Sequence, residues 1–350
     1  MPRWGPDAVI CFIRRTVLVI ASVGAVACAH VTKARQEAAS PAQTSAIDIA
    51  ISLFKAGQLS QARPILESEF SAHPEELAPV FYLGRIAFIK GRFSEAVELF
   101  ERATLLAPDR AEIYDYLGRA LGKVGAAANR IQGAVIAPKA KAAFEKAVEL
   151  APENLQARQD LLHYYLEIQS NVGIGADRIH KQAEAIARLD PVEGCVARGR
   201  ICEYHKEFDR ARGEYLAAVA GRPGDLEANR RLGSFCLATG DFMRGAEAFE
   251  NILKLDAQDV DARFQLGRAS ALSGGNLDRG ENLLREYLNH ECSRLDEPAE
   301  DLHSAVWAHY WLGKIRERRG RRDLAEIEYQ AALVINPDQA EIKKALKAVK

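Results

Sequence analysis

The sequence has few cysteines, almost no excess charge and no long apolar run beyond its first thirty residues. Its 350 residues contain six cysteines, too few for the disulfide framework that holds a small secreted domain together. The 47 Lys and Arg residues balance the 48 Asp and Glu residues. The charge balance therefore gives no indication of a nucleic-acid partner or of adhesion to an anionic membrane.

Sequence motifs for metal, nucleotide and nucleophilic chemistry are also missing or incomplete. The chain has no His-Glu-x-x-His sequence and no Ser, His and acid combination in a recognisable setting. Gly173-x-Gly175 lacks the preceding strand and the Gly-Lys-Ser/Thr ending of a phosphate loop. Cys202 and His205 could share a helix face, but a structural zinc site needs four ligands and no second pair is present. We therefore expect no enzyme activity, no metal and no small-molecule cofactor.

The cysteines themselves are better explained by packing than by chemistry. Cys195, Cys202 and Cys236 fall on the apolar sides of predicted helices, where free cysteine behaves as a small buried hydrophobe. Cys195 and Cys202 cannot form a disulfide within one straight helix, because seven residues rise about 10.5 Å. Cys292, in a long linker, is the one we expect to be reactive.

The first thirty residues have the features of a targeting segment. A basic lead formed by Arg3, Arg14 and Arg15 precedes the apolar run 16–29. That run is too short to span a bilayer comfortably, but it suits the apolar centre of a signal peptide. An exported protein is therefore predicted, with an uncleaved anchor as a further alternative.

Residues 24–28, Gly-Ala-Val-Ala-Cys, resemble the lipobox of bacterial lipoproteins, in which Cys28 would become the lipidated first residue. The same residues also fit an ordinary Ala-x-Ala cleavage site, so simple secretion is an alternative. We expect a signal peptide over 1–27 and a flexible, polar tether over 28–45. The predicted location is the cell envelope, in the periplasm, with a lipid anchor on Cys28.

From residue 46 onward, small, large and helix-breaking residues recur in a fixed order. Residues 77–110 show the order best, with Leu83-Gly84, Gly91, Ala96, Phe100, Ala103 and Pro108. Small residues such as Gly84 and Ala96 let two amphipathic helices approach closely enough to bury a shared stripe. Gly91 allows a tight turn between the helices, and Pro108 ends the second one. The unit therefore predicts a helical hairpin.

One hairpin cannot bury its own core, so the unit predicts copies of itself. Leu-Gly pairs recur at Leu83-Gly84, Leu117-Gly118, Leu232-Gly233, Leu266-Gly267 and Leu312-Gly313. With their accompanying Ala, aromatic and Pro positions they mark about eight repeats, near residues 43–76, 77–110, 111–154, 155–191, 192–225, 226–259, 260–305 and 306–339. Stacked helical hairpins with a continuous core follow from this periodicity.

The repeats resemble those of the tetratricopeptide repeat (TPR) family, whose A-x3-F…P pattern they share. The resemblance implies an all-α fold, a right-handed α-solenoid of about eight TPR helix-turn-helix repeats. Residues 340–350 are expected to form a C-terminal capping helix with an apolar stripe of Ile342, Ala345, Leu346 and Val349. Arg316 stands where the family has a small or apolar residue, which we interpret as the mark of an exposed terminal repeat.

Two insertions disturb the period. Residues 126–138 and 170–177 are expected to interrupt the turns within neighbouring repeats and to lie side by side on one edge. Their apolar residues are Ile131, Val135, Ile136, Val172 and Ile174. We predict that this edge is a contact surface, and the alternative is that these side chains pack against each other to close a widened gap.

The resemblance also implies a ligand groove. In the family the first helix of each repeat lines the concave face, and the residue after the Leu-Gly pair points into it. That column reads Ile51, Arg85, Arg119, His163, Arg200, Ser234, Arg268 and Lys314. A groove with positive charge attracts acidic partners. We therefore predict a carboxylate-bearing ligand held chiefly by Arg119, Arg200 and Arg268.

Aromatic residues one turn earlier, Phe81, Phe264 and Tyr310, are expected to assist. The alternative for the column is neutralisation by neighbours on the same helix, such as Asp115 for Arg119 and Glu203 for Arg200.

Two functions follow, from different classes. The first is a non-catalytic scaffold in the bacterial cell envelope that binds a protein or peptide, with acidic character, in its concave groove. The second is a structural or assembly factor of an envelope complex or of polysaccharide export machinery, which would use its outer surface and inserted loops. In both, the membrane is reached only through the lipid on Cys28, and no nucleic acid is bound.

Overall fold

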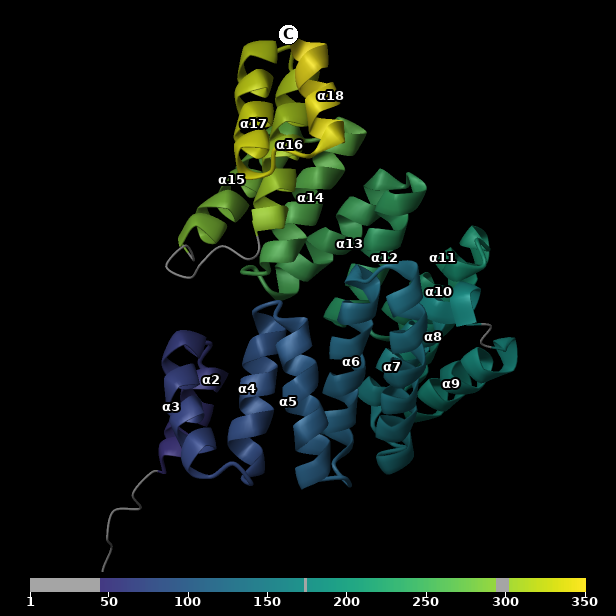
Figure 1. Cartoon of the computed structure of the whole chain (residues 1–350). Helices are drawn as coiled ribbons and strands as arrows, with labels where there is room; N and C mark the ends of the chain where they lie inside the picture. The colour runs from purple at the N-terminus through teal and green to yellow at the C-terminus, as the bar shows by residue number, and fades with distance from the viewer. Residues whose placement is uncertain (1–44, 173–174, 294–301) are drawn as a thin grey trace, which may run out of the picture. The chain divides into compact units, whose positions relative to one another are not determined.

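The computed structural model describes residues 45–172, 175–293 and 302–350, and these residues form helices joined by turns, with no strand among them (Figure 1). The expectation of an all-α repeat fold is confirmed. The predicted signal peptide, Cys28 and the tether up to residue 44 lie outside the described residues, as do Gly173 and Ile174. The chain divides into two compact units, residues 1–74 and 75–350.

The described part of the first unit is one helical hairpin, α2 (Ala46–Lys55) and α3 (Leu59–Ala72). Ser45 caps α2: its hydroxyl accepts a hydrogen bond from the Asp48 backbone N–H at 3.1 Å. In return, the Asp48 carboxylate accepts a hydrogen bond from the Ser45 backbone N–H. This reciprocal arrangement satisfies backbone donors that a helix start leaves unpaired. Ala50, Phe54 and Leu66 are buried between the two helices.

The described residues of the second unit form seven more hairpins and a last helix. The hairpins are α4 (Leu77–Ile89) with α5 (Phe93–Leu106), α6 (Ala111–Ala127) with α7 (Arg130–Leu150), α8 (Leu155–Val172) with α9 (Ala176–Leu189), α10 (Pro191–Tyr204) with α11 (Phe208–Gly221), α12 (Leu226–Thr239) with α13 (Phe242–Leu255), α14 (Val260–Ser273) with α15 (Leu277–Ser293), and α16 (Leu302–Arg318) with α17 (Arg322–Ile335); α18 (Ala340–Val349) follows. Each predicted repeat range corresponds to one hairpin, but α10 begins one residue before its range and α16 begins at Leu302, four residues before its range.

The Leu-Gly pairs have a common packing role. A Cβ atom placed on Gly84 would lie 2.7 Å from the Phe100 ring, so only glycine lets the ring of the second helix lie against the first. The same contact recurs in the pairs that contain Gly118, Gly233 and Gly313, which face Phe144, Phe249 and Tyr329, and at Gly199, which faces Tyr215. In the remaining pair, Gly267 packs against Leu284. The repeated spacing in the sequence is therefore the spacing of these close helix crossings.

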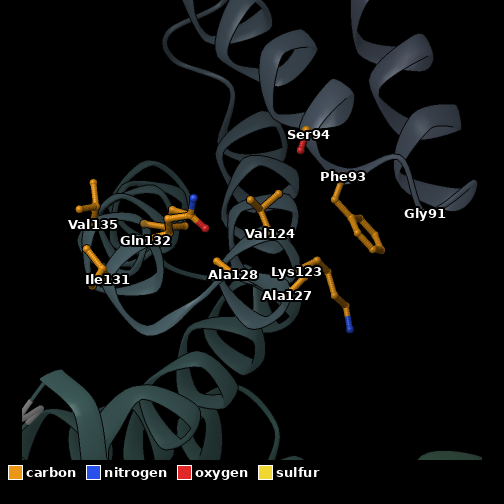
Figure 2. Close-up of a pocket in the computed structure, with 11 residues that line it drawn as sticks. Gly91, Phe93, Ser94, Lys123, Val124, Ala127, Ala128, Ile131, Gln132 and Val135 are labelled. Atoms are coloured by element: carbon orange, nitrogen blue, oxygen red, sulfur yellow. The ribbon is translucent and has the colours of Figure 1, made fainter. Parts of the chain in front are cut away.

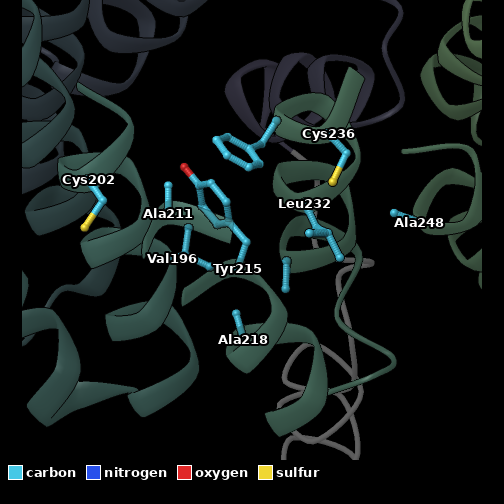
Figure 3. Close-up of a cluster of buried hydrophobic side chains, with 10 residues drawn as sticks. Val196, Cys202, Ala211, Tyr215, Ala218, Leu232, Cys236 and Ala248 are labelled. Carbon is cyan, nitrogen blue, oxygen red and sulfur yellow. The ribbon is translucent and has the colours of Figure 1, made fainter. Parts of the chain in front are cut away.

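The core of the second unit consists of buried clusters shared by adjacent helices. Figure 3 shows one of these clusters, with Tyr215 of α11 facing Leu232 and Cys236 of α12. The Tyr215 ring also packs against Phe235, with 5.3 Å between the ring centroids. Cys202 and Cys236 are buried, as predicted, and Cys195 is half-buried. Burial raises the pKa of the Cys236 thiol to about 11, so this cysteine is a packing residue and not a nucleophile.

Within the second unit, the first helices of successive repeats contact one another. These contacts join α4 to α6, α6 to α8, α8 to α10, α10 to α12, α12 to α14, and α14 to α16. The second helices of successive repeats make no comparable contact in the described part of the chain. The first helices therefore form the inner layer of this unit, on which a groove can be shared by several repeats.

The first insertion was predicted to interrupt a turn, and this prediction is wrong. Its residues lengthen both helices of the hairpin, so that α6 has 17 residues and α7 has 21, against 13 and 14 in α4 and α5. The helices can continue because they cross through glycine: a Cβ on Gly133 would lie 3.5 Å from the Gly125 carbonyl oxygen. Asn129 caps the start of α7 by accepting from Ile131 N and Gln132 N.

The second insertion is described only in part. Its first residues extend α8 to Val172, but residues 173–174 and the side chains of 169–172 are outside the described set. One contact does join α8 to the first insertion, because the Tyr164 hydroxyl donates to the Ala137 carbonyl at 2.8 Å.

Arg316 was predicted to be exposed, and it is buried, with 8% of its surface accessible. Its guanidinium pairs with Glu328 at 2.8 Å and with Glu281 at 3.6 Å. Helices α15 and α17 supply these carboxylates and cover the position, so charge pairing takes the place of the apolar contact found in other repeats.

Candidate functional site

The candidate site is a groove on the inner layer, lined by the first helices α8, α10 and α12. Its volume is about 470 Å³. The polar residues that line it are Gln156, Gln159, Asp160, His163, Glu193, Arg200, Glu227 and Arg231; we call it the polar groove. His163 and Arg200, which the sequence predicted from two different repeats, are both part of it.

Arg200 is the central basic residue of the polar groove. Its guanidinium contacts Nδ1 of His163, and no carboxylate pairs with it among the described residues. Burial lowers the pKa of Arg200, and the neighbouring charge of Arg231 lowers it further. The protein environment therefore disfavours the positive charge at this position, and an incoming anion would relieve that cost.

His163 acts as a hydrogen-bond acceptor for Arg200 and carries no charge of its own. Although 52% of its side chain is exposed, its pKa is lowered to about 4, first by desolvation and then by Arg200, Arg231 and Lys123. It is therefore neutral at neutral pH. Its Nε2 lies 3.1 Å from a Glu167 carboxylate oxygen, and its Nδ1 faces Arg200, whose orientation it fixes.

Arg119 and Arg268 continue the same column on α6 and α14. The Arg119 guanidinium lies over the rings of Phe88 and Tyr116, at 5.3 and 5.2 Å from their centroids. Arg268 lies 5.7 Å from the Trp311 ring, and burial lowers its pKa. Neither has an ion pair within the described ranges. Aromatic faces hold these guanidiniums in place and leave their edges available for carboxylates.

Arg85 lies in the same column on α4. It contacts the rings of Phe81, Tyr82 and Tyr116 at 5.7, 5.5 and 5.0 Å. Lys314, at the other end, forms an ion pair with Glu317 at 2.9 Å. Lys314 is therefore already neutralised, unlike Arg119, Arg200 and Arg268.

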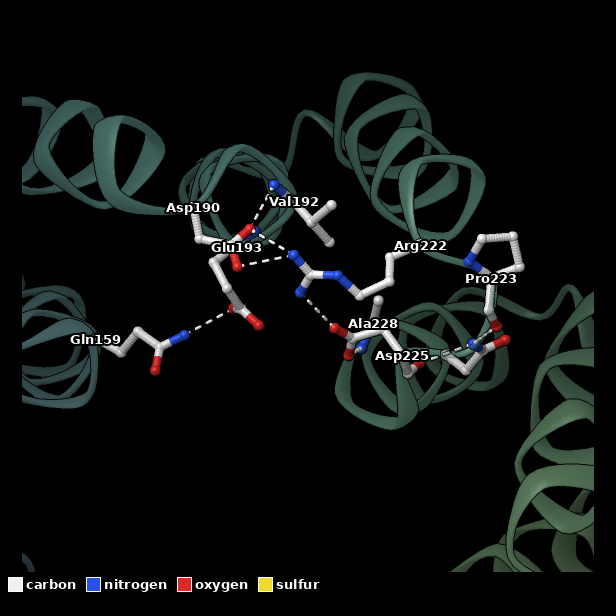
Figure 4. Close-up of polar contacts among 9 residues, drawn as sticks. Gln159, Asp190, Val192, Glu193, Arg222, Pro223, Asp225 and Ala228 are labelled. Carbon is white, nitrogen blue, oxygen red and sulfur yellow. Dashed lines mark hydrogen bonds and ion pairs between the residues drawn. The ribbon is translucent and has the colours of Figure 1, made fainter.

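Other arginines of these repeats are paired with acids. Arg222 donates to Asp190 at 2.8 Å and to Asp225 at 2.9 Å, a bridge between successive repeats (Figure 4). Arg230 pairs in the same way with Asp259 at 2.7 Å and Asp261 at 2.5 Å. Because such bridges recur between repeats, Arg119, Arg200 and Arg268 stand out within the column as positions where a ligand could supply the carboxylate.

The two acids predicted as possible neutralising neighbours do not form ion pairs with the column. Glu203 accepts a hydrogen bond from the Tyr215 hydroxyl at 2.8 Å. Asp115 is buried, and burial together with the nearby charge of Asp160 raises its pKa to about 7. The attraction of Arg119 opposes this rise but does not overcome it.

The aromatic residues expected to assist the ligand lie elsewhere. Phe81 and Tyr310 are buried in the core, with 4% and 5% of their surfaces exposed. The Tyr310 hydroxyl donates to Glu341 at 2.8 Å, and Phe264 packs against Tyr287 with 5.1 Å between the ring centroids. None of these rings lines the polar groove, although Phe81 contacts Arg85; the rings that contact Arg119 and Arg268 are Phe88, Tyr116 and Trp311.

The sequence reasoning missed the acidic side of the groove. Asp160, Glu193 and Glu227 line it together with the bases. Glu193 is buried and accepts from Gln159 at 2.6 Å (Figure 4), and burial followed by the charges of Asp225 and Asp190 raises its pKa. The signal was present, because acids one or two turns before the basic column recur in successive first helices.

The described residues contain no cluster of three or more His, Cys, Asp or Glu side chains arranged to hold a metal ion. In the same ranges, no helix is both long enough and apolar enough to cross a bilayer.

Known proteins share this helical-repeat architecture. A family model described as tetratricopeptide repeat matches residues 47–114 and 237–299. No curated protein matches the chain. Among solved structures, yeast Tom70 aligns at 15% identity over 83% of this chain and 57% of its own, with a TM-score of 0.59. A tetratricopeptide repeat protein from Parabacteroides merdae aligns at 13% identity over 87% of this chain and 97% of its own, with a TM-score of 0.47. The chain thus spans less than two thirds of the Tom70 chain.

Proposed function

We propose that this tetratricopeptide-repeat protein is a non-catalytic scaffold that binds a protein or peptide segment bearing carboxylates. The segment would lie along the inner layer of the second unit, across α6, α8, α10 and α14. Arg119, Arg200 and Arg268 would hold its carboxylates, and His163 would orient Arg200.

The observation that carries the proposal is that three half-buried guanidiniums of one column, those of Arg119, Arg200 and Arg268, have no carboxylate partner among the described residues. A desolvated arginine gains from a carboxylate because the pair forms two parallel hydrogen bonds in a region of low dielectric. Arg200 and Arg268 have pKa values lowered by burial, which is the signature of a charge whose partner is missing. Bases on successive repeats also match the reach of an extended chain.

The acidic side of the polar groove narrows the class of ligand. Asp160, Glu193 and Glu227 would repel a uniformly anionic polymer. The preferred ligand therefore presents its carboxylates to the arginine column and neutral or basic groups to the acids, as a peptide of mixed sequence can do.

The test measures binding of a fluorescein-labelled peptide that alternates Glu with small neutral residues, by fluorescence anisotropy. Replacing Arg119, Arg200 and Arg268 by Glu should weaken binding by at least about a hundredfold, because each charged hydrogen bond contributes about 1.5–3 kcal/mol. The matched control carries the same charge change on second helices, as Arg63→Glu, Arg188→Glu and Arg322→Glu. Undiminished binding by the first variant, with unchanged salt dependence, would show that the column is ordinary surface charge.

We further propose that the protein acts in the bacterial cell envelope and is anchored there through a lipid on Cys28. The support is the sequence of the first thirty residues, namely the basic lead, the short apolar run and Ala27-Cys28. Metabolic labelling with a fatty-acid probe tests this proposal. Wild type should be labelled and Cys28→Ala should not; equal labelling, or none in either, would exclude lipidation.

A further inference from the structure

We propose that the hairpin of α6 and α7 carries a second binding surface, an apolar groove with a basic border that takes an amphipathic helix with acidic residues from a partner protein. This surface is separate from the polar groove. It has a volume of about 640 Å³ and is formed by the start of α5, the end of α6 and the start of α7 (Figure 2).

The walls of this surface are apolar. Phe93 of α5, Val124 of α6, and Ile131, Val135 and Ile136 of α7 line it, and we call it the apolar groove. Ile131 is 80% exposed and Val135 is 63% exposed, although both belong to a well-formed helix. Side chains four residues apart share one helix face, so the two form a continuous exposed ridge beside the hollow. Exposed apolar patches of this kind mark interaction sites.

The exposure is not a packing defect of the insertion. The side of α7 that faces α6 is closed, because Gly125 and Gly133 bring the helices together and Ile136 lies 3.4 Å from the position of a Cβ on Gly125. Ile131 and Val135 lie outside that contact. The alternative in which the inserted apolar residues only fill a gap therefore accounts for Ile136 and not for these two.

The charge around the apolar groove selects the occupant. Residues 116–144 contain Arg119, Lys123, Arg130, Lys139 and Lys141 and no Asp or Glu. Lys123 lines the groove itself, and both it and Arg130 are exposed. A partner with acidic residues beside its apolar stripe complements this border. A helix fits the shape, since an amphipathic helix places side chains at i, i+3, i+4 and i+7 into an apolar groove.

Other occupants fit less well. A second copy of the chain that docked through this same surface would place two basic borders against each other. Residues 1–44 contain five Lys or Arg and two Asp or Glu, so this segment would also bring net positive charge to the basic border. A flat lipid surface would meet the ridge of Ile131 and Val135 but would leave Phe93 and Val124 uncovered.

The experiment uses the full-length protein and a fluorescein-labelled amphipathic peptide of about 18 residues, or five helical turns, with a Leu stripe and Glu elsewhere. Two comparison peptides have Lys in place of Glu, or the same composition without the stripe. The Leu–Glu peptide should bind saturably and the others at least about tenfold more weakly. Ile131→Glu with Val135→Glu should weaken its binding at least about tenfold. The matched control, Leu105→Glu with Val334→Glu, changes two side chains that are each 82% exposed and should bind like wild type.

Border charge is tested separately. Arg130→Glu should weaken the Leu–Glu peptide and reduce the dependence of its binding on salt, while binding of the alternating Glu peptide to the polar groove stays unchanged. Failure of one peptide and not the other therefore distinguishes the two proposals. The proposal of a helix site in the apolar groove would be overturned if the Leu–Glu peptide does not bind saturably, or if the Ile131 and Val135 variant binds it as well as wild type. It would also be overturned if the protein forms a dimer or associates with vesicles and this variant abolishes that association.

Discussion

Asp115 is a carboxyl group whose ionisation is strongly affected by the fold. It lies on α6 beside Asp160 of α8, and 8% of its surface is exposed. Burial and the charge of Asp160 raise its pKa from 3.8 to about 7. Between these values the folded protein binds a proton that the unfolded chain has released, so stability falls as the pH rises through this window.

We predict that Asp115→Asn stabilises the protein at high pH. Asparagine has the shape of the protonated acid and never acquires its charge. At pH 8 the free energy of unfolding should rise by at most about 4 kcal/mol, given about 1.36 kcal/mol for each pKa unit. At pH 4 the difference should be close to zero. Urea unfolding across this range measures it, with the exposed Asp109→Asn as the control; a gain that does not depend on pH would mean that ionisation is not its cause.

At the scale of elements, the junction of α15, α16 and α17 is held by buried charge. Arg316 pairs with Glu328 and Glu281, Arg319 also reaches Glu281 at 2.9 Å, and His309 lies 2.6 Å from Glu328. Removing one member of such a group leaves a buried charge without its partner.

Arg316→Ala should therefore lower the free energy of unfolding by about 3–5 kcal/mol. The exposed Arg322→Ala on α17 should change it by less than about 0.5 kcal/mol. Chemical denaturation of both variants measures the difference. If Arg316→Ala is as mild as Arg322→Ala, the ion pairs are incidental to the packing of these helices.

The hairpins could be predicted from the sequence because each depends on a local pattern. A glycine on the first helix and a ring on the second are the two halves of one contact, as Gly84 and Phe100 show. The same spacing therefore reports both the helices and their packing. Arg316 could not be interpreted in this way, because its partners Glu281 and Glu328 come from other helices and nothing local identifies them.

The prediction that the first insertion interrupts a turn was wrong for a different reason. Gly125, Gly133 and Pro138 look like helix breakers, yet the helices continue through all three. The two glycines serve the crossing of α6 and α7, a role that only the packed structure reveals. At the site, the residue after the Leu-Gly pair was predicted to face the groove, and Arg200 and His163 do lie together there. The residue one turn before that position was also expected to face the ligand, but Phe81 and Tyr310 are buried in the core.

At the scale of the second unit, stability is distributed along a row of neighbours. Each hairpin packs on the next, and in such arrays the loss of one contact is felt mainly by adjacent repeats. Helix α18 covers the last hairpin: Ile342, Ala345 and Val349 pack with Tyr310 and Tyr329 in one buried cluster. Without α18, this apolar surface would face water.

Removing residues 340–350 should therefore loosen α16 and α17 and leave distant hairpins almost unchanged. Burial of Ile342 and Val349 contributes on the order of 3–6 kcal/mol at about 1.5–3 kcal/mol for each side chain, all of it local. Hydrogen exchange should show faster exchange in α16 and α17, with protection retained in α10 to α13. Ile342→Asp should reproduce the effect without shortening the chain, and the exposed Lys344→Ala should not. If protection falls equally in every hairpin, the second unit unfolds as one cooperative body, and a ligand in the polar groove would then stabilise all of it at once.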